Sequence, residues 1–322
     1  MKRHGVRSAV LALLIAAAAP AMAQNYPAGP VKLVVPAAAG GSIDVIARLV
    51  AEQLARTWGQ QVLILNHPGG GTGIGARAAA TAAPDGSTLF FGLSSTFVAL
   101  PVLQPNLGFD VGRDFVPIGF VGEQPMVVAV SPALGVNSLA ELIALAKRQA
   151  GGLNCAVTQS GGLAHLSGEL LRRRAGIDLT FVHYPGTAQA VNDIVGGRVP
   201  MVVESLPGLL GAIGGQQLKP LAVAAPQRLE NFPELPPAAD TISDFVATGW
   251  FVLMGPPGTS PAIADKAGKD LTDVVTRPQL KQKLAELGTY TRAMSLDELK
   301  DFIASQQALW KPLVQQYAAR PQ

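Results

Sequence analysis

Two turns near the start of the chain consist almost entirely of small residues, and their composition and spacing could bind an anion. The first is Pro36–Asp44 and the second is Asn66–Gly73; each follows a short β-branched run and precedes an apolar helix. Such turns leave backbone N–H groups at a helix start open to a ligand, and the helix dipole favours negative charge there. The alternative explanation is structural, because a tight turn that needs glycine's backbone freedom has the same composition. Because the two turns follow neighbouring strands, they predict a floor for a carboxylate or a phosphate.

The second turn also fits an enzyme class. Gly69-x-x-x-Gly73-x-Gly75 matches the glycine pattern of short-chain dehydrogenases and lies between a predicted strand and helix. An NAD(P)-dependent oxidoreductase is therefore the alternative function. That family also needs a Tyr followed four residues later by a Lys, and none of the 4 tyrosines has one. The missing pair disfavours this alternative.

Other catalytic and metal-binding patterns are missing from the sequence. No serine stands in G-x-S-x-G, and neither H-E-x-x-H nor a P-loop occurs. His165 and Glu169 lie four residues apart on a predicted helix, where hydrogen bonding or capping is the expected role. Cys155, the single cysteine, stands in an apolar run and predicts a small buried residue in a strand. The sequence therefore predicts no enzyme, no metal site and no cofactor.

The N-terminus predicts export to the periplasm. Residues 1–23 combine a basic start, an apolar run too short to span a bilayer and the small-residue cleavage site Ala21-Met22-Ala23. The full chain has 25 basic and 22 acidic residues, and cleavage removes three basic residues and no acidic one. The mature chain is then formally neutral, which argues against nucleic acid and against electrostatic membrane docking.

The elements that position these residues predict an α/β fold. The 322-residue chain is 48% hydrophobic and 15% charged, which excludes a disordered chain or a coiled coil and suggests two domains. Short β-branched runs alternate with amphipathic helices, which indicates mostly parallel sheets. The predicted strands are Val31–Pro36, Gln61–Asn66, Thr88–Leu93, Met126–Ser131, Asn154–Thr158, Leu179–Tyr184, Pro200–Glu204, Leu218–Ala225 and Phe251–Gly255. The longest predicted helices are Ile43–Trp58, Leu139–Gln149, Ala262–Thr276 and Leu296–Tyr317.

Two segments rich in glycine or proline are candidates for the change from one domain to the other, namely Gly119–Pro125 and Ala224–Pro237. They predict a first domain made of residues 24–123 and 226–322 and a second domain of residues 124–225. Ligand clefts favour the seam between such domains.

Several stretches together resemble one known family. They are Val35–Arg48, Asn66–Gly75, Ala83–Leu89, Ser160–Glu169, His183–Gly186, Asp193–Gly197 and Gly255–Pro261. Over nearly the whole mature chain the sequence resembles the Bug-type extracytoplasmic solute receptors of tripartite tricarboxylate transporters. The resemblance implies a two-domain Venus-flytrap fold related to class II periplasmic binding proteins, in which each domain is a mostly parallel sheet flanked by helices, without catalytic chemistry.

The resemblance also implies a ligand site. In that family the two glycine-rich loops hold a ligand carboxylate, partly through water. The first-domain positions that match are Ala38, Ala39, Gly40, Gly41, Ser42, Asp44, Gly69, Gly70, Gly71, Thr72, Ser94 and Ser95. The second-domain positions are Ser160, Gly161, Gly162, His165, Tyr184 and Asp193, with Glu204 and Ser205 as further candidates. Asp44 and Asp193 could either contact the ligand or stabilise a helix start.

Three positions depart from the family pattern. Ala37 stands where an aromatic residue is common, Ile43 where a small polar residue is common, and Pro185 where a Lys is common. Because of these differences, the ligand of another family member does not predict the ligand of this chain. The implied function is capture of a small organic anion, a mono- or dicarboxylate, by domain closure. The partners implied are a tripartite tricarboxylate transporter permease or a sensor kinase, and the receptor is expected to be a monomer.

Overall fold

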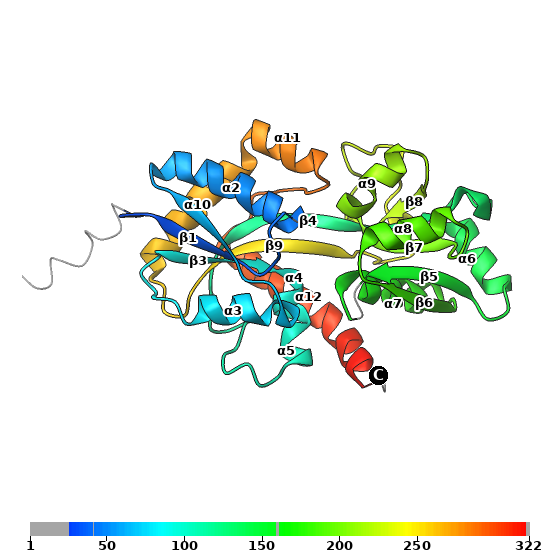
Figure 1. Ribbon diagram of the computed structural model, residues 1–322, viewed down its shortest axis with the longest axis horizontal. Helices are drawn as coiled ribbons and strands as arrows, with labels where there is room; N and C mark the ends of the chain where they lie inside the picture. Colours follow the sequence, from blue (N-terminus) through cyan, green and yellow to red (C-terminus); the bar gives the residue numbers. More distant parts are fainter. Residues whose placement is uncertain (1–25, 41, 159–160, 320–322) are drawn as a thin grey trace, which may run out of the picture.

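The computed structural model describes residues 26–40, 42–158 and 161–319, which form two lobes joined by long strands (Figure 1). The predicted signal peptide lies outside these residues. The strands are β1 (Val31–Val35), β2 (Val62–Asn66), β3 (Thr88–Leu93), β4 (Val116–Val130), β5 (Leu153–Thr158), β6 (Leu179–Tyr184), β7 (Met201–Ser205), β8 (Lys219–Val223) and β9 (Thr248–Gly255). The helices are α2 (Ser42–Trp58), α3 (Gly73–Ala80), α4 (Ser94–Val98), α5 (Leu100–Leu103), α6 (Leu139–Arg148), α7 (Leu163–Ala175), α8 (Thr187–Val195), α9 (Leu206–Gly214), α10 (Pro261–Thr276), α11 (Pro278–Glu286) and α12 (Leu296–Ala318).

The strands pair in one path, β2-β1-β3-β9-β4-β7-β5-β6, and β8 pairs with β4 beside it. Strand β4 belongs to both lobes, because its residues 116–125 pair with β9 and its residues 126–130 pair with β7 and β8. We call the lobe that contains β1, β2, β3 and β9 the first half, and the lobe that contains β5 to β8 the second half.

The predicted α/β class is confirmed, and the sheet differs from the prediction in two respects. The strand pairs β1–β2, β1–β3, β5–β6 and β5–β7 are parallel, whereas β9 is antiparallel to β3 and β4, and β4 is antiparallel to β7 and β8. The sheet is therefore mixed rather than mostly parallel. The two halves also share one sheet rather than being built on separate sheets, because β4 pairs with β9 in the first half and with β7 and β8 in the second.

Gly119–Pro125, a candidate for the change from one domain to the other, lies inside β4, which changes its pairing partners after Pro125. The pairing with β9 shifts next to Gly119 and Gly122, as at β-bulges. A Cβ at Gly119 would lie 2.9 Å from Cδ2 of Leu271 in α10, and one at Gly122 would lie 3.1 Å from the carbonyl oxygen of Tyr290. These glycines therefore allow neighbouring segments to pack closely against the strand. From the sequence alone, they could not be told apart from glycines that interrupt a strand.

The carboxyl ends of six strands face one another across the boundary between the halves. Strands β3 and β4 run in the same direction, since both are antiparallel to β9, and β1 and β2 are parallel to β3. Strand β7 runs opposite to β4, and β5 and β6 share the direction of β7. As a result β1–β3 end toward the second half and β5–β7 end toward the first half, which is where ligands bind in open α/β sheets.

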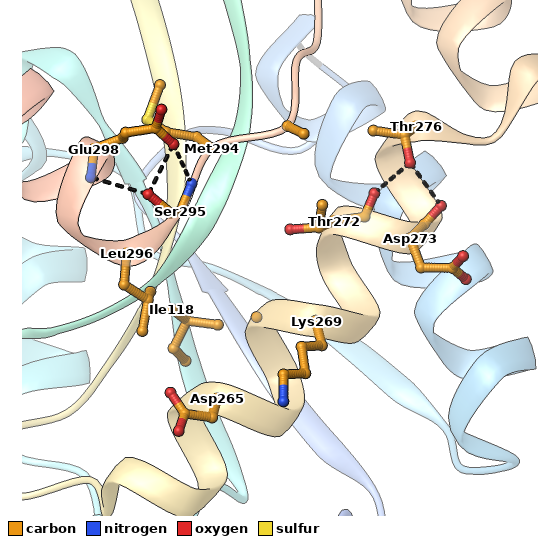
Figure 2. Close-up of a pocket in the computed structure, with 12 residues that line it drawn as sticks. Ile118, Asp265, Lys269, Thr272, Asp273, Thr276, Met294, Ser295, Leu296 and Glu298 are labelled. Atoms are coloured by element: carbon orange, nitrogen blue, oxygen red, sulfur yellow. Dashed lines mark hydrogen bonds between the residues drawn. The ribbon is translucent and has the colours of Figure 1, made fainter.

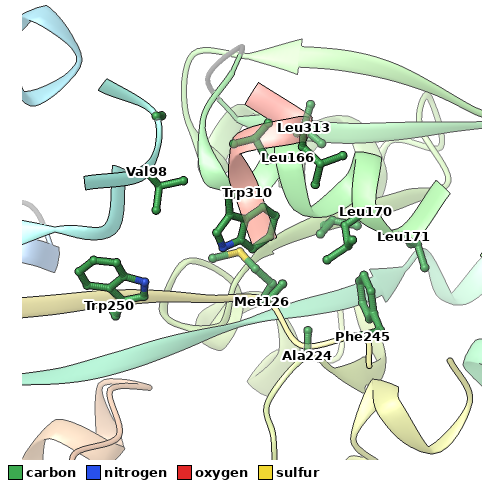
Figure 3. Packing of buried hydrophobic residues seen from close by; sticks show 14 of the residues in the cluster. Val98, Met126, Leu166, Leu170, Leu171, Ala224, Phe245, Trp250, Trp310 and Leu313 are labelled. Carbon is green, nitrogen blue, oxygen red and sulfur yellow. The ribbon is translucent and has the colours of Figure 1, made fainter. Parts of the chain in front are cut away.

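One buried hydrophobic cluster runs through both halves, and two others each lie within one half. In the shared cluster, Trp310 of α12 lies between Val98 of α4 and Leu166 of α7 (Figure 3). Figure 1 shows α12 passing beneath the strands from the first half toward α7. The C-terminal helix therefore packs on both halves.

Cys155 is buried in β5, as predicted, and burial raises the pKa of its thiol to about 12. The thiol therefore stays protonated at neutral pH, which makes it a poor nucleophile. Within residues 26–40, 42–158 and 161–319, no helix has the length and apolar character needed to cross a membrane.

Candidate ligand-binding site

The first glycine-rich turn joins β1 to α2 and is fastened by one buried carboxylate. Asp44 is 2% exposed, and its Oδ2 accepts hydrogen bonds from the Gly40 N–H (2.9 Å) and from Arg48 Nε (2.8 Å). Its Oδ1 accepts a third from Asn66 Nδ2 (3.0 Å), which also donates to the Ala37 carbonyl oxygen (3.1 Å). The Gly40 N–H is therefore not available to a ligand. The sequence left open whether Asp44 contacts the ligand or stabilises the start of α2, and these contacts show that it also fastens the turn before that helix.

The electrostatics of Asp44 agree with this role. The hydrogen bond from Arg48 is the largest of the influences that lower the pKa of the Asp44 carboxyl to about 2. Burial opposes this shift, and the hydrogen bonds from Gly40 and Asn66 add to it. The carboxylate is therefore charged at every pH at which the protein is expected to work.

We expect Asp44→Asn to lose a stabilisation that depends on pH. Because the folded-state pKa of about 2 lies below the ordinary 3.8, the Asp44 carboxylate stabilises the fold fully above about pH 4, and this contribution is lost as the pH falls through about 2. The free energy of unfolding should be about 1–3 kcal/mol lower in the variant at pH 7, and the difference should shrink below about pH 4. Urea unfolding of both proteins across this range measures it. Equal stability at pH 7 would contradict the role.

Four successive residues of the second glycine-rich turn have a left-handed backbone. Their φ angles are 108° at Gly69, 58° at Gly70, 58° at Gly71 and 82° at Thr72. Thr72 is the only one with a side chain, and L-residues rarely adopt this region. Its Oγ1 accepts a hydrogen bond from Thr96 Oγ1 of α4 (2.9 Å), and Gln104 Nε2 donates to the Gly70 carbonyl oxygen (2.9 Å). These two contacts hold the turn in its strained shape.

The two glycine-rich turns meet at Gly75 in the first turn of α3. A Cβ at this position would lie 2.7 Å from Cβ of Pro36 and 3.1 Å from the carbonyl oxygen of His67. Any side chain would push α3 away from both turns. The glycine that completes the dehydrogenase-like pattern thus has a packing role that requires no nucleotide.

The start of α4, directly after β3, places two hydroxyl groups at the boundary between the halves. Ser94 is buried and Ser95 is half-buried, and both line a small cavity. The other lining residues are Val98, Ala99, Leu163, Leu166 and Trp310. Because α4, α7 and α12 each contribute to this cavity, its walls come from both halves (Figure 3).

In the second half, a histidine closes the turn between β5 and α7. The Gly161 N–H donates to Nδ1 of His165 (3.0 Å), so the neutral imidazole carries its proton on Nε2, which lies 3.9 Å from Oε1 of Glu169. The ring is 2% exposed. It contacts the rings of Phe181, His183 and Tyr317. These contacts support the hydrogen-bonding role predicted for His165 rather than direct contact with a ligand.

Tyr184, the last residue of β6, is tied to the helix that follows. Its hydroxyl donates to Oδ2 of Asp193 (2.8 Å), and Oδ1 of Asp193 accepts from Nε of Arg198 (2.9 Å). The Arg198 guanidinium, with the Tyr184 hydroxyl, lowers the pKa of the Asp193 carboxyl. Partial burial and the Asp193 carboxylate raise the pKa of Tyr184, so its hydroxyl keeps its proton.

Glu204 ties the ends of two neighbouring strands together. It is 6% exposed, and its Oε2 accepts from Oγ1 of Thr158 (2.5 Å) at the end of β5. Its Oε1 accepts from both the N–H (2.7 Å) and the hydroxyl (3.0 Å) of Ser205 at the end of β7. Like Asp44, Glu204 is engaged within the protein and positions the groups around it.

The structure places the predicted residues that it describes at the facing ends of the six strands or in the helices that follow. Ala38, Ala39 and Gly69–Gly71 are exposed, and Gly162 is half-buried. Gly41 and Ser160 lie outside the described residues, and only the backbone of Ser42 is described, within α2. The residues that position the site and that the sequence did not single out are Arg48, Asn66, Thr96, Gln104, Thr158 and Arg198.

Two larger cavities lie away from these turns. One of about 620 Å³ lies between α10 and the start of α12, where Ser295 and Glu298 already satisfy the helix start through a capping box (Figure 2). The other, of about 720 Å³, lies between α11 and residues 225–231, over Glu123 of β4. Burial raises the pKa of Glu123 although Arg292 is 3.7 Å away. Among the residues that the structure describes, no group of three or more His, Cys, Asp or Glu side chains could hold a metal ion.

The sequence matches a known family and a curated relative. Residues 46–318 match the family described as "Tripartite tricarboxylate transporter family receptor". The protein BugT of Bordetella pertussis is 34% identical over 317 residues, a match that covers 97% of each chain.

Two solved structures share the fold. An R. palustris protein, whose structure is described "with adipate", has a TM-score of 0.78 and 28% sequence identity, and the match covers 91% of this chain and 98% of that one. The periplasmic binding protein BugD has a TM-score of 0.74 and 29% identity, with 92% and 100% of the two chains covered. These comparisons identify a solute receptor and give no support to the dehydrogenase alternative.

Proposed function

The chain belongs to the tripartite tricarboxylate transporter receptor family, and on that premise we propose that it captures a small organic anion, a mono- or dicarboxylate, between its two halves. The observation that carries the proposal is the pair of glycine-rich turns at the starts of α2 and α3. Both turns are exposed, both are held in shape by hydrogen bonds, and both lie at carboxyl ends of strands that face the second half. The relative with adipate supports a carboxylate as the ligand class.

In this proposal, some of the residues that the sequence singled out contact the ligand, and the others position the residues that do. Ala38, Ala39 and Gly69–Gly71 receive a carboxylate on backbone N–H groups and the helix dipoles of α2 and α3, while Thr72, whose N–H donates to the Gly69 carbonyl oxygen, offers its hydroxyl. Ser94 and Ser95 add hydroxyl donors. Tyr184, Ser205 and the turn at Gly161 form the opposite wall, while Asp44, His165, Asp193 and Glu204 hold these groups in place.

The proposed domains are residues 24–123 with 226–322, and residues 124–225, joined where β4 and β9 pass between the halves. A ligand that contacts both halves binds a closed form better than an open one and shifts the protein toward closure. Leu229 and Leu235 pack in the core of the second half, which places the return to the first domain after these residues and before β9 rather than at residue 226.

The proposed site of action is the periplasm, reached after cleavage of residues 1–23. The proposed partners are a tripartite tricarboxylate transporter permease, which would accept the ligand, or a sensor kinase, which would respond to the closed form. The receptor is proposed to work as a monomer without a cofactor.

A thermal-shift screen against a library of small carboxylates tests the proposal. Because a ligand that binds only the folded state stabilises it by RT ln(1 + [L]/Kd), an acid at a hundred times its Kd should raise the Tm by roughly 5 °C. NAD and NADP serve as controls and should leave the Tm unchanged. A library without any stabilising carboxylate would contradict the proposal, and a saturable shift with NAD would favour the oxidoreductase.

A further inference from the structure

Three side-chain hydroxyls stand at the ends of adjacent strands on the wall that faces the first half. They belong to Ser205 of β7, Thr158 of β5 and Tyr184 of β6, and we call them the hydroxyl row. Thr158 and Tyr184 are register partners, and β5 pairs with β7 on its other edge. All three residues are partly exposed. A ligand held on the two glycine-rich turns would extend toward this row.

Each hydroxyl of the row has already given its only proton to a carboxylate. Thr158 and Ser205 donate to the two oxygens of Glu204, and Tyr184 donates to Asp193. A carboxylate has only acceptor atoms, so the hydroxyl must be the donor in each pair. What the row still offers is the lone pairs on its three oxygens. Hydrogen bonds to ionised acceptors are the strong ones, so these protons are firmly held.

Among the described residues, no charged group near the hydroxyl row turns it into a hydrogen-bond donor. Arg198, the cation nearest to Tyr184 in the network, is paired with Asp193. Pro185 follows Tyr184 directly, so the next residue in the chain supplies neither a cation nor a backbone N–H. The three side-chain hydroxyls of the row thus present acceptors backed by two carboxylates.

We infer that the ligand carries a hydrogen-bond donor, a hydroxyl or an ammonium group, at the end that meets the hydroxyl row, opposite the carboxylate held by the first half. The inference rests on the proposed function and narrows its ligand class to hydroxy acids and amino acids. A second carboxylate at this end would face three acceptor oxygens. It would have to displace Glu204 or Asp193 from their hydroxyl partners before it could bind.

Four acids that differ only at the far end test the inference by calorimetry: butanoate, 4-hydroxybutanoate, 4-aminobutanoate and succinate. The corresponding three-carbon and five-carbon series cover other spans. In the series that fits the site, an acid with a hydroxyl or ammonium end should bind about tenfold or more tightly than the acid with a methyl end, and the dicarboxylate should bind more weakly than the hydroxy acid.

Substitutions in the hydroxyl row test whether it causes the preference for an acid with a donor at its far end. Tyr184→Phe and Thr158→Val each remove one acceptor oxygen and should reduce the preference for the donor-bearing acid several-fold. Tyr290→Phe is the matched control, because the buried Tyr290 hydroxyl has no hydrogen-bond partner among the described residues, and it should leave the preference unchanged. The double variant Asp193→Ala/Arg198→Ala frees the Tyr184 proton without changing net charge and should shift the preference toward the dicarboxylate.

The outcomes separate this inference from the proposed function. If acids bind but the methyl or dicarboxylate member binds best, or if the row variants behave like Tyr290→Phe, the inference is wrong and the receptor function stands. If no acid of any series binds, the proposed function is wrong and the inference fails with it.

Discussion

Replacing Gly40 with leucine is expected to abolish ligand binding, by at least a hundredfold in affinity, while the protein still folds. The φ angle of Gly40 is +81°, and a Cβ there would have no atom within 4 Å. A leucine would therefore project from the first glycine-rich turn into the space where the carboxylate should lie, without displacing any part of the protein. Its left-handed backbone should cost about 1–2 kcal/mol of stability, which a protein of ordinary stability tolerates. Calorimetry with the tightest acid of the screen measures the loss.

Gly59→Leu is the matched control for this variant. Gly59 follows the other end of α2, has a φ of +64° and also has open space around a Cβ. The substitution introduces the same strain in the same half of the protein, far from the turn, and should leave the affinity unchanged. If the folded Gly40→Leu protein bound as tightly as Gly59→Leu, the first turn could not be part of the site.

Replacing Trp310 with alanine is expected to lower the free energy of unfolding by about 3–5 kcal/mol, since the indole is 1% exposed and leaves a cavity when it is removed. Trp310 belongs to the hydrophobic cluster that runs through both halves, and it lines a small cavity together with Val98 of α4 and Leu166 of α7 (Figure 3). The wild-type protein should therefore unfold in one cooperative transition. Urea unfolding followed by circular dichroism measures both quantities.

Trp58→Ala provides the comparison. Trp58 is only half-buried, lies in the first half and donates from Nε1 to Oδ2 of Asp270 (2.7 Å). Its removal should cost less than the removal of Trp310. Equal losses in the two variants would contradict the particular importance of the helix that packs on both halves.

Local sequence patterns predicted the helices and strands whose bounds depend only on their own residues. Strand β3 (Thr88–Leu93) and β6 (Leu179–Tyr184) have the predicted bounds, and α2 differs from its prediction by one residue. Their apolar residues are visible within a short window, and Gly59 marks the end of α2. The second part of β4 was predicted as the strand Met126–Ser131, but its first part was not visible in this way, because Gly119 and Gly122 are required by neighbours from α10 and the segment at Tyr290.

The hydrogen bonds that position Asp44 and Glu204 join residues that are distant in sequence. Asn66 reaches Asp44 because β1 and β2 pair with Val35 opposite Asn66. Thr158 reaches Glu204 only because β5 lies next to β7. Without the strand order, the sequence could place a carboxylate near a turn but could not tell whether it faces a ligand or holds the turn. The pairing of the strands settles which partners are in reach.

A crystal structure of the protein with the tightest-binding acid of the screen tests the central claim most directly. We predict that the ligand carboxylate lies about 3 Å from backbone N–H groups of the two glycine-rich turns, Pro36–Asp44 and Asn66–Gly73, with the other end of the ligand toward Tyr184. The ligand should contact both halves. An acid bound instead in the cavity over Glu123, or in the cavity between α10 and α12, with the two turns unoccupied, would contradict the account.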